Sequence, residues 1–175
     1  MSPIERMTSF FFAGKHLLII FDQNMVMILD SLKGIFDRDI EKVKQELTLY
    51  RNEENLWKTQ KNIKNSGGNL ALHLTGNLKH FIGAILGDSG YIRNRDAEFL
   101  DKNIPVQDMV RQLDEVKTMI HNTFARLSQE DLEKKYPVNV FGYEMNTLYF
   151  LMHLIAHLNY HLGQINYHRR LIDKS

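Results

Sequence analysis

The feature that most constrains the fold is the recurrence of apolar residues at steps of three and four. It is clearest between Met25 and about Asn52, and the positions are Val26, Ile28, Leu29, Leu32, Ile35, Phe36, Ile40, Val43 and Leu47. A helix with one apolar face shows this spacing because it completes a turn every 3.6 residues, whereas a half-buried strand alternates. This segment is therefore predicted to be a long amphipathic helix.

Three further segments have helical patterns, over about 69–86, 106–127 and 147–172. Ser66-Gly67-Gly68, Pro105 and Tyr136-Pro137 separate them, and such residues stop helices or make turns. Four helices without an alternating strand pattern predict an all-α protein, specifically a four-helix bundle. The connection over residues 90–105 is long, and loops of this length often carry function or cross a bundle.

Length and composition favour one globular domain, with 175 residues, 43% apolar and 25% charged. Residues 1–24 precede the regular pattern, so we assign them as an N-terminal extension and place the domain at 25–175, with Met25 or Met27 as an alternative start. Lys15 and His16 interrupt the apolar runs of the extension, which fall short of the ~20 residues that span a bilayer and lack a signal cleavage site. We therefore predict a cytoplasmic protein without a membrane partner.

Charge and cysteine content exclude several functions. A net charge of +1 provides no broad electrostatic footprint for a phosphate backbone, so a nucleic-acid partner is not expected. The chain contains no cysteine, which removes disulfides, thiolate ligands and a cysteine nucleophile. Any thiol chemistry would need a thiol from outside the chain.

Histidines are concentrated on the two most apolar predicted helices. On the last helix His153, His157 and His161 follow at intervals of four, and Gln164 continues the same face. Buried ring nitrogens without partners cost on the order of 1–3 kcal/mol each, so a row of imidazoles needs partners or a metal. Two histidines at i and i+4 can converge on one cation. Spacing alone permits either His153 with His157 or His157 with His161.

The second predicted helix supplies a third candidate ligand. Asn69, His73, Asn77 and His80 form a polar stripe within it, although His80 lies a rise of about 10.5 Å beyond His73, too far to share its cation. Three imidazoles leave a coordination position open, as in catalytic sites. They suit zinc or nickel, with iron as a further option, and disfavour calcium and magnesium. Structural roles are expected for the remaining histidines, which are His16, His121 and His168.

The segments HLNYHLGQINYHRRLI and NLALHLTGNLKHFIGA resemble the DinB-like (DinB/YfiT-like) metalloprotein superfamily over about residues 25–175, and GYIRNRDAEF resembles an uncharacterised subgroup of it. The resemblance implies an up-down-down-up four-helix bundle. It also implies a metal triad of His73, His157 and His161, which selects His161 over His153. His153, Asn77 and Gln164 are then candidates for supporting positions around the triad.

The resemblance further implies a metal-dependent thiol S-transferase. A low-molecular-weight thiol such as bacillithiol would occupy the open metal position and attack a small electrophile, with Arg93 and Arg95 as candidates for binding its carboxylates. The alternatives are a metal-dependent hydrolase, for which Asp114 or Glu115 is a candidate base, and a non-catalytic metal-binding protein. A homodimer is expected because the stretch 148–162 is more apolar than one bundle is expected to bury.

Overall fold

The computed structural model describes residues 27–60 and 62–174, and the predicted extension at 1–24 lies outside this range. The all-α prediction is confirmed, because the described residues form helices and connections, with no strand beyond one isolated bridge between Lys135 and Asn146. No helix among the described residues is long and apolar enough to cross a membrane.

The first described helix covers residues 27–48. Its buried apolar residues follow the predicted stripe and are Leu29, Leu32, Phe36, Ile40, Val43 and Leu47. Each such side chain contributes about 1.5–3 kcal/mol when it is fully buried, so this face drives the helix against its neighbours. A short 3-10 helix, η1 (Glu53–Trp57), follows.

Helix α2 (Gly67–Leu78) is buried on almost every side, which explains why apolar residues predominate in its sequence. The side chain of Ser66 caps it by accepting a hydrogen bond from the Asn69 backbone N–H. The predicted helix to about residue 86 is divided in the structure, because α2 continues into a π-helical segment, η2 (Lys79–Ala84). There the Ile85 N–H bonds the His80 carbonyl at 3.0 Å, five residues back.

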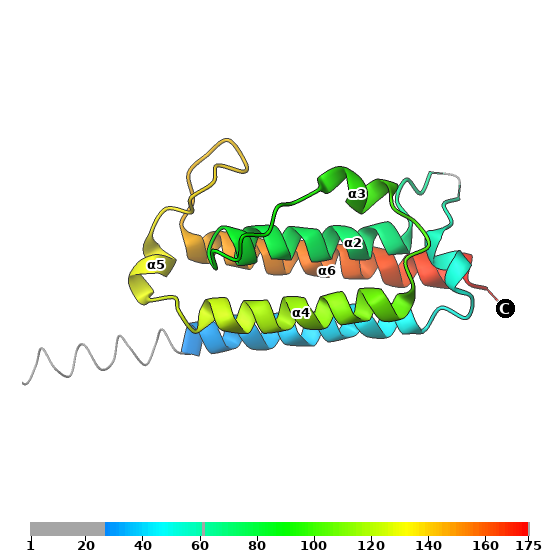
Figure 1. Cartoon of the computed structure of the whole chain (residues 1–175), viewed down its shortest axis with the longest axis horizontal. Coiled ribbons are helices and arrows are strands. Elements are labelled where there is room, and N and C mark those ends of the chain that lie inside the picture. Colours follow the sequence, from blue (N-terminus) through cyan, green and yellow to red (C-terminus); the bar gives the residue numbers. More distant parts are fainter. Residues whose placement is uncertain (1–26, 61, 175) are drawn as a thin grey trace, which may run out of the picture.

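The long connection contains a helix that the periodicity did not predict. Helix α3 (Arg95–Leu100) has only six residues, too few to show a helical pattern. Asn94 caps it, and the Asn69 amide donates from α2 to the backbone carbonyls of Glu98 and Asp101, at 3.1 and 2.9 Å. The connection is thereby attached along α2 (Figure 1).

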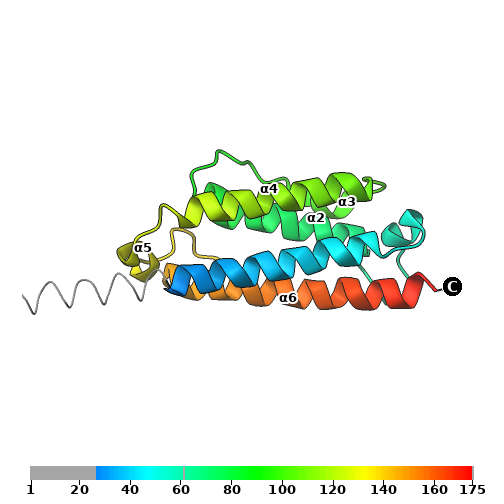
Figure 2. The same cartoon turned by 90° about the horizontal axis from the view of Figure 1, so that it is seen from below.

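The remaining helices are α4 (Val106–Phe124), the short α5 (Gln129–Glu133) and α6 (Thr147–Ile172). Figures 1 and 2 show the helix of residues 27–48, α2, α4 and α6 side by side along the long axis. The first helix and α6 run toward the end of the molecule that holds the C-terminus, and α2 and α4 run away from it (Figure 1). Helices α2 and α6 are therefore antiparallel neighbours, which brings the two histidine-bearing faces together.

Candidate metal centre

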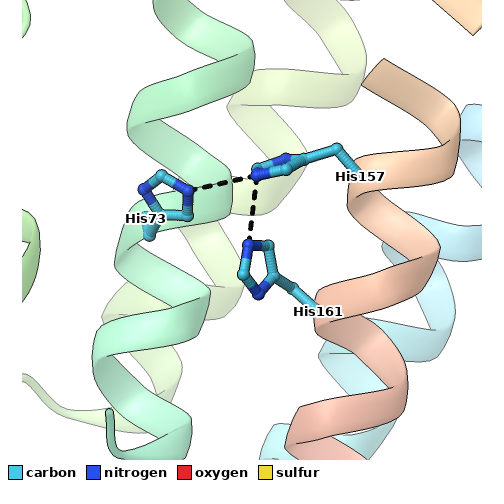
Figure 3. A group of neighbouring side chains, drawn as sticks. All are labelled: His73, His157 and His161. Carbon is cyan, nitrogen blue, oxygen red and sulfur yellow. Dashed lines mark hydrogen bonds between the residues drawn. The ribbon is translucent and has the colours of Figure 1, made fainter. Parts of the chain in front are cut away.

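Three histidine side chains converge between α2 and α6. His73 comes from α2, and His157 and His161 come from successive turns of α6 (Figure 3). The Nε2 atom of His157 lies 3.3 Å from Nε2 of His73 and 3.1 Å from Nε2 of His161. One nitrogen from each of the three rings lies within 4.8 Å of the others. The structure thus brings together the three residues that the resemblance selected.

A buried carboxylate that the sequence analysis missed stands behind His73. Glu98 of α3 is 5% exposed, and its Oε2 lies 2.9 Å from Nδ1 of His73. Arg93 donates to both carboxylate oxygens, from Nε at 2.6 Å and from Nη2 at 2.8 Å. Burial alone would raise the pKa of Glu98, but the hydrogen bonds from His73 and Arg93 outweigh it and lower the pKa. The carboxylate is therefore ionised and accepts a hydrogen bond from the Nδ1–H of His73.

The hydrogen-bond partners assign the ring tautomers. Because ionised Glu98 only accepts, His73 carries its proton on Nδ1 and presents an unprotonated Nε2. His161 also carries its proton on Nδ1 and presents an unprotonated Nε2, since its Nδ1 lies 2.7 Å from the accepting Oε1 atom of Gln164. The Nε2 atom of His157 faces both lone pairs and has at most one proton to donate, while its buried Nδ1 has no partner. The three rings therefore cannot satisfy one another by hydrogen bonding, because at least one of the inward lone pairs remains without a donor.

The geometry and protonation of the cluster fit a divalent metal. Tetrahedral zinc with bonds of 2.0–2.1 Å places its ligand nitrogens about 3.3 Å apart, close to the separations from His157. Burial, followed by the neighbouring imidazoles and Arg93, lowers the pKa of His157 to about 3. Burial also lowers the pKa of His161, against the opposing effect of Gln164. Both rings are thus neutral near pH 7, the form that binds metals.

A cavity of about 400 Å³ opens beside His73 and His157. Its aromatic lining is Phe81, Phe141 and Phe150. Its polar lining is Asn77, Arg93, Arg95 and His153. Pockets of this size, mostly apolar with a few polar groups, accommodate small molecules. A ligand in the cavity would therefore contact two of the three candidate metal ligands.

The other predicted site residues take different positions. Gln164 supports His161 as described, whereas Asn77 and His153 line the cavity and make no hydrogen bond to the triad. The His153 ring lies between Phe141 and Phe150, with centroids at 4.6 and 5.8 Å, and burial lowers its pKa. The Oδ1 atom of Asn77 is buried without a partner. Both residues thus line the cavity without a hydrogen bond to the triad.

The two predicted substrate-binding arginines differ. Arg93 donates two hydrogen bonds to Glu98 and also lines the cavity, and its binding of a substrate carboxylate stays a prediction. Arg95 is exposed, and its Cζ lies 6.0 Å from the centroid of the Phe99 ring. Arg95 also lines the cavity, so its charge remains near any ligand there.

Glu98 was missed because periodicity does not predict a six-residue helix. A ligating histidine usually donates its second ring N–H to a carboxylate, carbonyl or water, and this rule was the available signal. It would have directed attention to the few acidic residues just after the second helix. The candidate bases Asp114 and Glu115 lie elsewhere, in exposed ion pairs with Lys44 and Lys79.

Two of the histidines expected to be structural, His168 and His121, have partners of their own. His168 is buried between the Tyr50 hydroxyl, 2.6 Å from Nδ1, and the Lys58 carbonyl, 2.8 Å from Nε2. His121 is exposed and contacts Asp37 at 2.9 Å. His80 lies in η2 outside the triad, as its distance along the helix predicted, and His16 lies outside the described residues.

These features define a class: an all-helical protein with a candidate three-histidine metal centre between two antiparallel helices. The chain belongs to the family described as protein of unknown function (DUF1572), whose model matches residues 23–175. A comparison with curated proteins gives no match.

Proposed function

We propose that the chain is a DinB-like four-helix bundle of up-down-down-up topology that binds one divalent transition metal through His73, His157 and His161. The opposed helix directions support the topology (Figure 1). The observation that carries metal binding is the convergence of three Nε2 atoms, two with their lone pairs directed inward by Glu98 and Gln164. Imidazole ligands favour zinc or nickel, with iron as a further option.

The activity we propose is transfer of a small thiol to a small electrophile. A bound divalent cation lowers the pKa of a coordinated thiol and so supplies a thiolate near neutral pH. The chain has no cysteine, so the thiol is a cosubstrate, with bacillithiol as the first candidate. The cavity beside the triad would bind the electrophile against Phe81, Phe141 and Phe150, and Arg95 would attract the carboxylates of the thiol.

One observation favours a second candidate, a metal-dependent hydrolase. His153 lines the same cavity, and its pKa is lowered by burial, so the imidazole is neutral near pH 7. A neutral imidazole beside a metal-activated water is a suitable general base. In this proposal His153 is the candidate general base, in place of Asp114 and Glu115.

Metal binding is tested by elemental analysis of the purified chain beside His73→Ala, His157→Ala and His161→Ala. We expect about one metal per chain in the wild type and none in the three variants, because each removes one ligand. His121→Ala is the matched control, since this exposed histidine lies on α4 away from the triad. Wild-type occupancy in all three triad variants would overturn the proposed site.

The reaction is tested with metal-loaded protein, monobromobimane or chlorodinitrobenzene, and bacillithiol or glutathione in turn. Turnover that requires the thiol and disappears in His157→Ala supports the transferase. Thiol-independent cleavage of an ester that disappears in His153→Ala supports the hydrolase. Absence of both with full metal occupancy supports a non-catalytic metal-binding protein.

We also propose that the chain forms a homodimer. Helix α6 buries Phe150, Leu151, Leu154 and Leu158 within the chain but leaves Met152 58% exposed. Exposed apolar surface on such a helix favours a second subunit. Light scattering should give twice the mass of the chain, and the monomer mass at micromolar concentration would contradict this proposal.

A further inference from the structure

We infer that Glu98, held in place by Arg93, positions His73 as a metal ligand and sets how tightly the centre holds its cation. This inference rests on the proposed metal-binding function and assigns a task to α3, the helix in the long connection. The observation that motivates it is a carboxylate buried directly behind one of three converging imidazoles, with a hydrogen bond from Arg93 to each of its oxygens.

The contact between Glu98 and His73 determines which ring nitrogen faces the other histidines. Because the carboxylate can only accept, the 2.9 Å contact places the proton on Nδ1 and the lone pair on Nε2, opposite His157. A carboxylate also withdraws this proton partially and makes Nε2 a stronger donor to a metal. His161 has only a neutral amide partner, Gln164, so His73 is the most strongly supported ligand of the three.

Arg93 allows the carboxylate to remain buried. Its guanidinium binds both oxygens of Glu98 in the planar, two-pronged geometry that arginine forms with carboxylates. The Arg93 side chain is itself only 13% exposed, so the ion pair is shielded from water. The guanidinium orients the carboxylate plane and balances its negative charge. Without this partner, a buried carboxylate would strongly destabilise the fold.

The surrounding backbone is shaped to admit this carboxylate. Gly76 lies one turn after His73 on α2, and a Cβ at this position would overlap the Oε1 atom of Glu98. The Asn69 amide holds the Glu98 and Asp101 carbonyls from one turn before His73. The α2 surface around His73 thus provides both the space for the Glu98 side chain and the attachment for its backbone.

The test compares metal affinity in the wild type, Glu98→Gln and Gly76→Ala, measured by competition with a chromophoric zinc chelator. Glu98→Gln keeps the shape but removes the charge, and Gly76→Ala displaces an unaltered carboxylate. We expect each to weaken zinc binding by about 10–100-fold, the usual effect of losing a partner of a metal ligand. The absorption bands of Co²⁺ bound in place of zinc should also shift, because the donor strength and orientation of His73 change.

Two control variants separate positioning from general stability. Glu115→Gln makes the same chemical change at an exposed glutamate paired with Lys79 and should leave affinity and spectrum unchanged. Tyr50→Phe removes a buried hydrogen bond to His168 and should lower the melting temperature without altering the centre. Wild-type affinity and Co²⁺ spectra in both Glu98→Gln and Gly76→Ala would overturn the inference. Absence of metal binding in the wild type would instead overturn the proposed function itself.

Discussion

The half-buried His157 and the buried His168 lie on the same helix, α6, but their ring nitrogens have very different surroundings. His168 is 3% exposed, and both of its ring nitrogens have partners, the Tyr50 hydroxyl and the Lys58 carbonyl. His157 has an unpartnered Nδ1, and its Nε2 faces two other imidazoles. Burial lowers the pKa of both rings.

The difference lies in the partners that the fold supplies. The Lys58 carbonyl accepts from Nε2 of His168, so Nδ1 is free to accept from Tyr50, and the ring is satisfied as a neutral residue of the core. The surroundings of His157 cannot satisfy it in this way, because two inward lone pairs compete for one proton. A histidine in the interior therefore indicates a metal site only when the fold provides too few hydrogen-bond donors for the ring-nitrogen lone pairs gathered there.

The largest expected effect separates the two residues by function. His157→Ala should abolish stoichiometric metal binding, whereas His168→Ala should retain about one metal per chain. His168→Ala should instead lower the free energy of unfolding by about 1–3 kcal/mol for each partner left unsatisfied. Elemental analysis and denaturant unfolding of both variants test this. If His168→Ala lost its metal while its circular dichroism spectrum stayed native, the distinction between a metal-binding His157 and a structural His168 would be wrong.

Metal removal should reproduce the same contrast. A cation present at 1,000 times its dissociation constant stabilises the folded state by about 4 kcal/mol, which is about 10 °C in melting temperature for a chain of this size. Chelation should therefore lower the melting temperature of the wild type and of His168→Ala by similar amounts. It should not change that of His157→Ala, and a shift in that variant would indicate a metal bound elsewhere.

Acid should destabilise the metal-free protein through both rings. An unfolded histidine titrates near 6.5, but the folded pKa of His157 is about 3 and that of His168 is also lowered. The unfolded chain thus binds protons first, so the stability present above pH 6.5 declines as the pH falls toward 3. His157→Ala should decline less steeply, by at most about 1.4 kcal/mol per pH unit. Both profiles of stability against pH are measured by denaturant unfolding. If the wild type and His157→Ala gave parallel profiles, the lowered pKa of His157 would be contradicted.

Tyr50→Phe should have a smaller effect that is confined to His168. It leaves Nδ1 of His168 without its donor and should cost about 1–3 kcal/mol in denaturant unfolding. Metal stoichiometry should stay at the wild-type value because the hydroxyl has no contact with the triad. Any metal loss would show that the two histidine environments are coupled along α6.

The exposed His121 provides the smallest expected effect. Its contact with Asp37 is an exposed ion pair, and such pairs contribute about 0–1 kcal/mol. His121→Ala should change the free energy of unfolding by no more than this and leave metal occupancy intact. A larger loss would mean that the pairing of α4 with the first helix depends on this contact.

The sequence by itself determined the helices whose apolar stripes are long. The stripe from Leu29 to Leu47 and the breaks at Ser66-Gly67-Gly68 and Pro105 follow from local geometry, since 3.6 residues per turn and the properties of glycine and proline act within a few residues. The i, i+4 spacing of His157 and His161 is local in the same way, and it placed both rings on one face of α6.

Only the tertiary structure decided which histidines share a site and what supports them. Glu98 reaches His73 from another helix, and Tyr50 and Lys58 reach His168 across more than 100 residues of chain. Such contacts depend on how whole helices pack, because a ring nitrogen is satisfied by whichever group the neighbouring backbone brings within about 3 Å. The spacing of the histidines along α6 is thus a local property, while the difference between its candidate ligand His157 and its core histidine His168 arises from packing.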